Sequence, residues 1–168
     1  MVSNGRLRGD EKKSPRKVLI LGVGNLLLTD DGFGVHVLTA LQKRGVPANV
    51  TLLEAGTISH QMILTFGEFD LLIVIDAVLA GDVPGALFRF SPNEMRFMPE
   101  RKMSLHELSL IDVLNMAELC GGKPETIIIA VQPKDVTSWS LELSEEVKAA
   151  IPKTLDLITE ELKNAGVL

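Results

Sequence analysis

The sequence predicts a single three-layer α/β/α domain of the α/β class, in which helices cover both faces of a mostly parallel sheet. Two observations predict this class. Short, uninterrupted apolar runs alternate along the chain with longer segments whose apolar residues recur at helical spacing. The runs are rich in Val, Ile and Leu and lack the polar alternation of a half-exposed strand, so we expect strands buried on both faces. The length of 168 residues corresponds to about one domain with its own core.

The first half of the chain predicts two strands, each followed by a helix. A continuous apolar run leads into the turn at residues 22–25, as expected for a buried strand. Gly34, Val37 and Leu41 then fall on one helical stripe. The predicted elements are a strand over 17–22, a helix that stops before Gly45 and Pro47, a strand over 50–54, and a helix from near Thr57 or Ser59 to Gly67.

The second half continues the alternation. Ser104 and Glu107 have the spacing of a capping box, which marks the start of a helix. Ser144 precedes two glutamates and an amphipathic stripe, as expected at another helix start. The predicted elements are a strand over 71–75 closed by Asp76, an edge strand over 86–90, a helix from Leu105 to about Cys120, a strand over 126–131, and a last helix capped by Ser144 and kinked at Pro152.

Charge and cysteine content limit the classes of function. Residues 1–17 carry a net charge of +4 and the remainder −9. We therefore expect a flexible basic leader over 1–16 and one domain over 17–168, whose acidic body argues against a nucleic-acid partner. A single cysteine, Cys120, excludes a disulfide framework and favours a reducing, cytoplasmic setting. No run approaches the about 18 apolar residues of a membrane span, so no membrane partner is expected.

Carboxylates follow two of the predicted strands. In open α/β sheets ligands bind beyond the carboxyl ends of the strands. Asp30 and Asp31 come after the first strand, where helix capping accounts for only one of the two. Asp76 ends an otherwise uncharged apolar run, so its carboxylate needs a partner. The turn at 22–25 does not indicate a dinucleotide site, because Leu27 stands where the third glycine would be.

His106 is the third candidate. It is the second residue of the capped helix, where the positive end of the helix dipole favours the neutral imidazole that binds metals. We assign ordinary surface roles to the other two histidines, His36 and His60. Two carboxylates and one imidazole from different elements make a plausible but incomplete shell for a divalent metal. From the residues alone the prediction is a possible metal site.

The sequence resembles the hydrogenase maturation endopeptidases, which are nickel-dependent proteases that trim the C-terminus of the large subunit of [NiFe] hydrogenases. Five segments in the order of that family carry the resemblance, and they cover most of the chain from Lys17 to the last helix. The segments are LGVGNLLLTDDGFGV (21–35), EAGT (54–57), LIVIDA (72–77), SLHE (104–107) and IAVQP (129–133).

The resemblance implies a five-stranded twisted sheet and a metal site formed by Asp31, Asp76 and His106. It also implies that nickel, the expected cofactor, arrives already inserted in the large-subunit precursor, and that these three residues take open positions on it. Many members have glutamate where Asp31 stands, which leaves open whether Asp31 ligates directly and whether Asp30 assists. The family is often classed as aspartic-type. We expect a cytoplasmic monomer that docks transiently on the [NiFe] hydrogenase large-subunit precursor.

Two alternatives stay open at this point. A non-cleaving nickel-sensing chaperone or checkpoint protein would share the same three ligands. A peptidyl-tRNA hydrolase is similar in its Gly-x-Gly-Asn start on an α/β/α domain, but the acidic body argues against it, and we find no match to the further catalytic pattern of that family.

Overall fold

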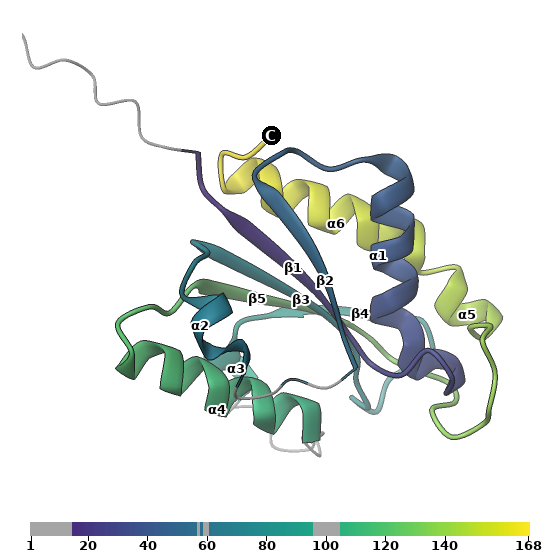
Figure 1. Ribbon diagram of the computed structural model, residues 1–168. Helices are drawn as coiled ribbons and strands as arrows, with labels where there is room; N and C mark the ends of the chain where they lie inside the picture. The colour runs from purple at the N-terminus through teal and green to yellow at the C-terminus, as the bar shows by residue number, and fades with distance from the viewer. Residues whose placement is uncertain (1–14, 57, 59–60, 96–104) are drawn as a thin grey trace, which may run out of the picture.

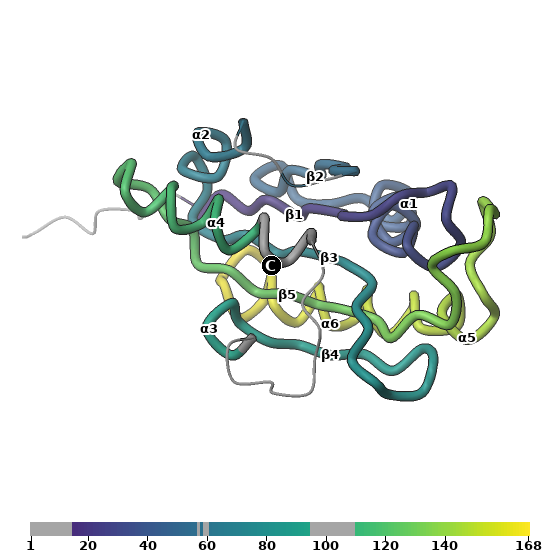
Figure 2. The backbone as a smooth tube through the Cα atoms, turned by 90° about the horizontal axis from the view of Figure 1, so that it is seen from below, coloured from purple at the N-terminus to yellow at the C-terminus, as the bar shows by residue number. Residues whose placement is uncertain are grey.

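The computed structural model describes residues 15–56, 58, 61–95 and 105–168, and for residues 95 and 105–109 it describes the backbone alone. One five-stranded sheet with the order β2-β1-β3-β5-β4 forms the centre of the domain (Figures 1 and 2). Four strands are parallel, and β4 is antiparallel at the edge where it was predicted. The strands are β1 (Val18–Val23), β2 (Val50–Ala55), β3 (Leu71–Ala77), β4 (Leu87–Phe90) and β5 (Glu125–Val131).

Helices cover both faces of this sheet, which confirms the three-layer α/β/α prediction. Figure 1 shows α1 and α6 on one face and α2 and α4 on the other. The helical elements are η1 (Thr29–Gly32), a short 3₁₀ helix, then α1 (Phe33–Arg44), α2 (Met62–Phe66), α3 (Pro92–Met95), α4 (Leu105–Leu119), α5 (Glu145–Lys148) and α6 (Ile151–Asn164).

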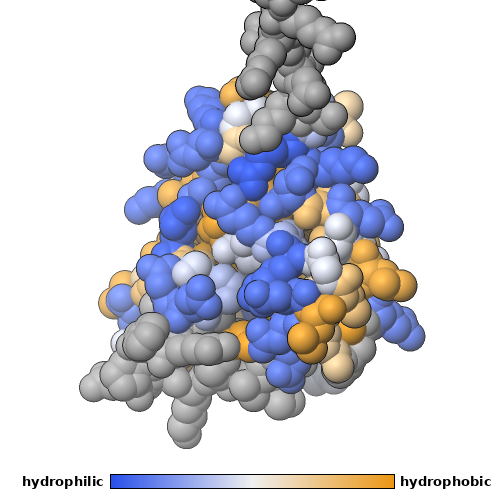
Figure 3. Space-filling model, turned by 90° about the vertical axis from the view of Figure 1, so that its left-hand side faces the viewer, coloured by the Kyte–Doolittle hydropathy of each residue, from blue (hydrophilic) through white to orange (hydrophobic). Residues whose placement is uncertain are grey.

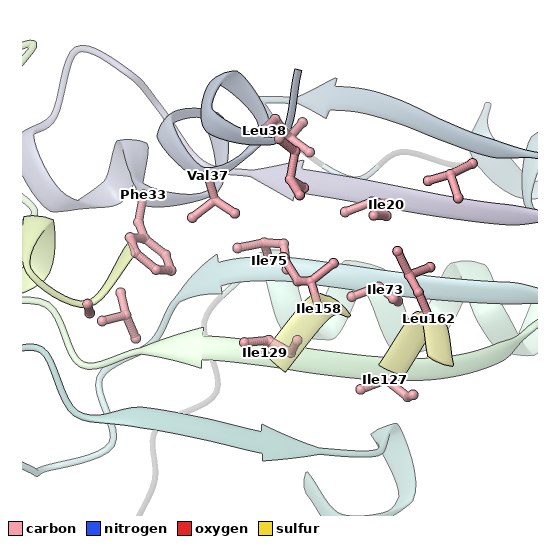
Figure 4. Packing of buried hydrophobic residues seen from close by; sticks show 14 of the residues in the cluster. Ile20, Phe33, Val37, Leu38, Ile73, Ile75, Ile127, Ile129, Ile158 and Leu162 are labelled. Carbon is pink, nitrogen blue, oxygen red and sulfur yellow. The ribbon is translucent and has the colours of Figure 1, made fainter. Parts of the chain in front are cut away.

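Two apolar cores lie on the two faces of the sheet. Side chains alternate along each strand, so Ile73 and Ile75 pack towards α1 and α6, whereas Leu72 and Val74 pack towards α2 and α4. Figure 4 shows the first core, in which Phe33 and the branched residues of three strands interlock with α1 and α6. Because both faces are covered, the central strands have no solvated side, and this explains their uninterrupted apolar sequences.

The predicted leader over 1–16 lies almost entirely outside the described residues, which begin at Pro15. Residues 1–14 fall outside them. Arg16, the last residue of that leader, is tied to the domain: its guanidinium donates to Glu125 Oε2 at 2.7 Å, and its backbone oxygen accepts from the Asn49 side chain at 2.7 Å.

Two helix predictions were wrong in their details. The second helix begins at Met62 and not near Thr57 or Ser59, which lie outside the described residues; Ile58 between them is buried in the core and is not helical. The predicted last helix is two helices, α5 and α6, with a break at residues 149–150. Pro152 lies in the first turn of α6, where its missing N–H removes no helical hydrogen bond, so it does not kink a continuous helix.

In the part of the chain that the structure describes, no helix combines the length and the apolar character that a membrane crossing requires.

Candidate active site

The two candidate aspartates lie at the same edge of the sheet. Strands β1 and β3 are parallel neighbours, with Gly22 opposite Ile75. Asp76 follows Ile75 directly, and η1, which carries Asp31, begins six residues after the end of β1. The carboxyl ends of adjacent parallel strands therefore bring both carboxylates to one end of the domain, where ligand sites of such sheets are found.

Asp31 is fixed by a tight return of the chain onto the end of β1. Its Oδ2 accepts the N–H of Asn25 at 2.7 Å. Gly24 has a φ of +123°, and a Cβ at this position would lie 1.8 Å from the backbone oxygen of Asp31. The glycine is required because the backbone of η1 occupies the space of a side chain. This is the physical role of the Gly-x-Gly-Asn turn.

Asp31 borders an open pocket of about 550 Å³ at this edge. Glu54 lines the same pocket from β2, where it stands opposite Gly22 of β1, and it is exposed. Glu54 is the last residue of the strand predicted over 50–54, and this place near the carboxyl end of a strand beside β1 is the sequence signal for a site residue. The other lining residues are Gly24, Asn25, Leu26, Leu28, Val35 and Gly56.

The second candidate aspartate, Asp76, is nearly buried. It is 3% exposed, stands opposite Ala130 of β5, and its Oδ1 accepts the N–H of Ala77 at 2.8 Å. By strand alternation its side chain lies on the face covered by α2 and α4. Helix α4 leads into β5 and runs back along the sheet, so it begins at the carboxyl edge (Figure 1). His106 is its second residue; the side chain of His106 lies outside the described residues.

Asp30 has a structural role that distinguishes it from Asp31. It is fully buried, and its carboxylate accepts four hydrogen bonds from the segment after β5. Oδ2 accepts the N–H of Lys134 at 2.8 Å, the N–H of Asp135 at 3.0 Å and the hydroxyl of Ser144 at 2.9 Å, while Oδ1 accepts the N–H of Ser144 at 2.7 Å. We call this group of contacts the Asp30 clamp. Through these contacts the Asp30 carboxylate holds the segment after β1 against the segment after β5.

The capping interpretations therefore need correction. Gly32 occupies the N-cap position of α1, without a side-chain cap, so neither Asp30 nor Asp31 caps that helix. Ser144 does stand at the N-cap of α5, but its hydroxyl donates to Asp30 and makes no capping bond. Asp30 and Ser144 bond to each other instead of capping a helix, and the carboxylate of Asp31 accepts the Asn25 N–H.

The same loop is stiffened from within by Asp135. Hydrogen bonds from Ser138 and Thr137 hold the pKa of the Asp135 carboxyl well below its usual range. His36, which we expected to have an ordinary surface role, places its Nε2 3.1 Å from the backbone oxygen of Leu141 and so links α1 to this loop. The loop after β5 is therefore attached both to η1 and to α1.

Of the three predicted metal ligands, the structure describes the side chains of Asp31 and Asp76. Among the side chains that the structure describes, no three His, Cys, Asp or Glu residues gather closely enough to hold an ion. This set does not include the His106 side chain. The structure thus brings Asp31, Asp76 and the start of α4 to the same edge, and the three-residue metal site stays a prediction.

The fold and this edge define a class: a small α/β/α domain with carboxylates at the carboxyl ends of adjacent parallel strands, the usual place of a ligand or catalytic site. Residues 35–161 match the family model of the hydrogenase maturation protease, HycI. The chain belongs to the hydrogenase maturation protease family, and its reaction class is the hydrolysis of a peptide bond by an endopeptidase.

Individual relatives agree with this assignment. The hydrogenase expression/formation protein HupD of Bradyrhizobium diazoefficiens is 37% identical over 154 residues, which cover 90% of this chain and 80% of that protein. The hydrogenase 2 maturation protease of Escherichia coli is 31% identical over 154 residues, or 90% of this chain and 93% of that protein.

Solved structures show the same fold. The hydrogenase maturating endopeptidase HybD from E. coli superposes with a TM-score of 0.80 at 31% identity, covering 89% of this chain and 94% of that one. The [NiFe] hydrogenase maturation protease HybD from Thermococcus kodakarensis gives a TM-score of 0.72 at 30% identity, covering 87% and 98%. These likenesses confirm the predicted family and fold, and they favour the protease over the peptidyl-tRNA hydrolase alternative.

Proposed function

We propose that the protein removes the C-terminal extension of a [NiFe] hydrogenase large-subunit precursor after nickel insertion, and that it recognises the nickel bound in that precursor. The observation that carries the proposal is the gathering of Asp31, Asp76 and the His106-bearing start of α4 at one edge of the sheet, in a member of this protease family. Carboxylate oxygen and imidazole nitrogen are suitable donors for nickel.

The two aspartates would meet the metal from different surroundings. Asp31 borders the open pocket, and the Asn25 N–H on its Oδ2 fixes the orientation of the carboxylate. Asp76 is nearly buried between β1 and β5, so its carboxylate is held in place and partly desolvated. Three protein ligands leave further positions to groups of the precursor, as expected when the ion arrives with the substrate.

Peptide-bond hydrolysis at this site needs a water molecule and a group that takes its proton. The water oxygen attacks the scissile carbonyl carbon, a carboxylate of the site accepts the proton, and the proton passes to the leaving amine nitrogen as the C–N bond breaks. Nickel of the substrate would act as a Lewis acid on the carbonyl or on the water. The aspartic-type class belongs to this proposal, with Asp31 and Asp76 as the reacting carboxylates. Glu54 adds a second carboxylate to the pocket that Asp31 lines.

The test is to incubate the protein with nickel-loaded and nickel-free precursor and to follow the mass of the large subunit. We expect cleavage of the loaded precursor only. The variants Asp31→Asn, Asp76→Asn and His106→Ala should each lose at least a hundredfold in rate. Asp112→Asn is the matched control, because Asp112 is an exposed aspartate on α4. Equal processing of both precursors would contradict nickel recognition, and processing of neither would contradict the protease function on this substrate.

The same experiment separates the protease from a non-cleaving chaperone or checkpoint protein. A protease predicts that the wild-type protein cuts the loaded precursor and that Asp76→Ala binds it without cutting. A chaperone predicts binding without cleavage by both proteins. A pull-down with the loaded precursor, analysed by mass, therefore decides between the two.

We also infer a reducing, cytoplasmic setting, since the chain has one cysteine, Cys120, and this residue is an exposed free thiol. A monomer that docks transiently on the precursor is the simplest arrangement for this function. Sedimentation at increasing protein concentration tests the monomer: a constant sedimentation coefficient is expected, and a rise to a dimer value would contradict it.

A further inference from the structure

Exposed apolar side chains gather around the carboxyl edge of the sheet. Among the described residues, ten large apolar side chains are more than one-third exposed, and six of these lie on the loops that follow β1, β3 and β5. The six are Leu26, Leu27, Leu79, Val83, Trp139 and Leu141. The opposite side of the molecule, at the amino ends of the strands, is mostly hydrophilic, with apolar surface towards its lower right (Figure 3). Clustering of this kind marks an interaction surface, whereas single exposed apolar residues do not.

Leu27 and Trp139 lie side by side in a short piece of sheet outside the main one. Leu28 and Ser140 form a parallel bridge, in which the Ser140 N–H donates to the Leu27 oxygen at 3.1 Å and the Thr29 N–H donates to the Ser140 oxygen at 3.0 Å. Neighbours of a bridged pair point to the opposite face, so Leu27 and Trp139 share one face. They are 48% and 79% exposed, which leaves two adjacent apolar side chains in water.

This surface is held rigid by contacts already described. The Asp30 clamp and the turn around Asp135 fix both ends of the loop, the Thr29 hydroxyl donates to the Ser138 oxygen at 2.7 Å, and His36 contacts the oxygen of Leu141. A surface that is ordered before binding loses little conformational entropy when a partner covers it. The side chains of Leu27, Trp139 and Leu141 are therefore organised for contact, although they stand in solvent.

The composition around these side chains matches that of a protein interface. Residues 25–29 and 138–141 contain no charged side chain, while Asp31, Asp135 and Glu142 stand at their flanks. Interface centres are depleted in charge and enriched in tryptophan, with a polar rim. Leu26 and Leu28 also line the pocket that contains Asp31, so the surface is continuous with the candidate site. A polypeptide that reaches Asp31 along this side would cover it.

We propose that Leu26, Leu27, Trp139 and Leu141 form a docking surface, the Trp139 surface, for an uncharged apolar segment of the large-subunit precursor. The inference rests on the proposed function and deepens it. Asp31, Asp76 and His106 would bind the metal, and the Trp139 surface would bind the polypeptide around it. Trp139 is the anchor, since a large rigid aromatic side chain contributes most to such contacts.

The kinetic test uses Trp139→Ala and Leu27→Ser in the full chain, with nickel-loaded precursor. We expect Trp139→Ala to raise KM at least tenfold with kcat within threefold of wild type, and Leu27→Ser to raise KM less. Leu64→Ser is the matched control, because Leu64 is 77% exposed on α2 and lies outside this surface. A Trp139→Ala protein with KM within twofold of wild type overturns the Trp139 surface alone. A wild-type protein that does not cut the precursor overturns the proposed function as well.

A spectroscopic readout tests direct contact. The chain has one tryptophan, so incorporation of 5-fluorotryptophan gives a single ¹⁹F resonance, that of Trp139. In an Asp76→Ala protein, which is expected to bind the precursor without cutting it, we expect this resonance to shift when loaded precursor is added. An unchanged resonance, at concentrations where sedimentation shows the complex, overturns the proposal. A shift with protease concentration alone also overturns it, because the occupant would then be a second copy of this chain.

Discussion

The Asp30 clamp allows a sharp prediction about two neighbouring aspartates that look equivalent in the sequence. The perturbation is Asp30→Asn. An asparagine has one acceptor oxygen and one NH₂ donor, whereas the carboxylate of Asp30 accepts four hydrogen bonds on two oxygens. If the amide oxygen replaces Oδ2, the NH₂ group faces the Ser144 N–H, with 2.7 Å between the heavy atoms of the native bond. If the amide is flipped, its NH₂ group takes the place of Oδ2 and faces three donors, the N–H groups of Lys134 and Asp135 and the hydroxyl of Ser144.

The magnitude follows from these contacts. A buried N–H left without an acceptor costs about 1–3 kcal/mol, and losing the charge weakens the remaining bonds by about 1 kcal/mol more. We therefore expect Asp30→Asn to lower the free energy of unfolding by about 3 kcal/mol, which corresponds to a decrease in Tm of about 6–12 °C for a chain of this length. Asp30→Ala leaves all four donors without the side-chain acceptor and should cost more.

The assay is urea unfolding followed by far-UV circular dichroism, with the fluorescence anisotropy of Trp139 as a local probe of the clamped loop. Asp31→Asn is the matched control: the new amide oxygen can still accept the Asn25 N–H in a partly exposed position, so a loss of about 0.5 kcal/mol or less is expected. The reasoning is refuted if Asp30→Asn loses less than about 1 kcal/mol, or if Asp31→Asn loses as much as Asp30→Asn.

Three further predictions concern packing and charge. Gly34→Ala should cost about 2–3 kcal/mol in urea unfolding, because its Cβ would lie 2.5–2.6 Å from backbone oxygens of β1 and β3. Gly56→Ala is the control and should stay within about 0.5 kcal/mol, because among the described residues no atom beyond its chain neighbours lies within 4 Å of the new Cβ; equal midpoints for the two variants would contradict this. Arg89→Ala should cost about 2 kcal/mol because it leaves the carboxylate of Glu161, 7% exposed, without its cation, and an unchanged midpoint would show that the pair contributes little. The pKa of Asp135 is depressed in the folded state, so its ionised carboxylate stabilises the fold above about pH 4, and this contribution is lost as pH falls through the folded-state pKa. The difference in free energy of unfolding between wild type and Asp135→Asn should therefore shrink from about pH 6 towards about pH 2.5. A difference that does not change with pH would contradict this linkage.

The central sheet could be predicted because its signal is local. The runs around Ile20, Ile73 and Ile128 are apolar at every position, and such runs indicate strands covered on both faces. Placing Asp31 and Asp76 at one edge followed from the rule for parallel sheets, and the register of β1 against β3 agrees with it.

The roles of the individual residues at that edge could not be predicted, because they depend on distant contacts. Nothing next to Asp30 in the sequence distinguishes it from Asp31; the difference comes from Lys134, Asp135 and Ser144 more than 100 residues away. Trp139 likewise has no recognisable motif around it, and its place beside Leu27 exists only through the bridge at Leu28 and Ser140. Local propensity does not contain such pairings.

The Asp30 clamp also fixes when the site can form during synthesis. Its bond to the Ser144 N–H joins residues 114 positions apart, so the turn that presents Asp31 gains its support only after most of the chain has been made. Contacts of such long sequence separation form late because loop closure must come first. A nascent chain that ends before Ser144 would carry all three candidate ligands, yet the clamp on Asp30, the neighbour of Asp31, would lack two of its four hydrogen bonds. The support of the Asp31 turn by the Asp30 clamp would therefore be complete only as the last helices, α5 and α6, are synthesised.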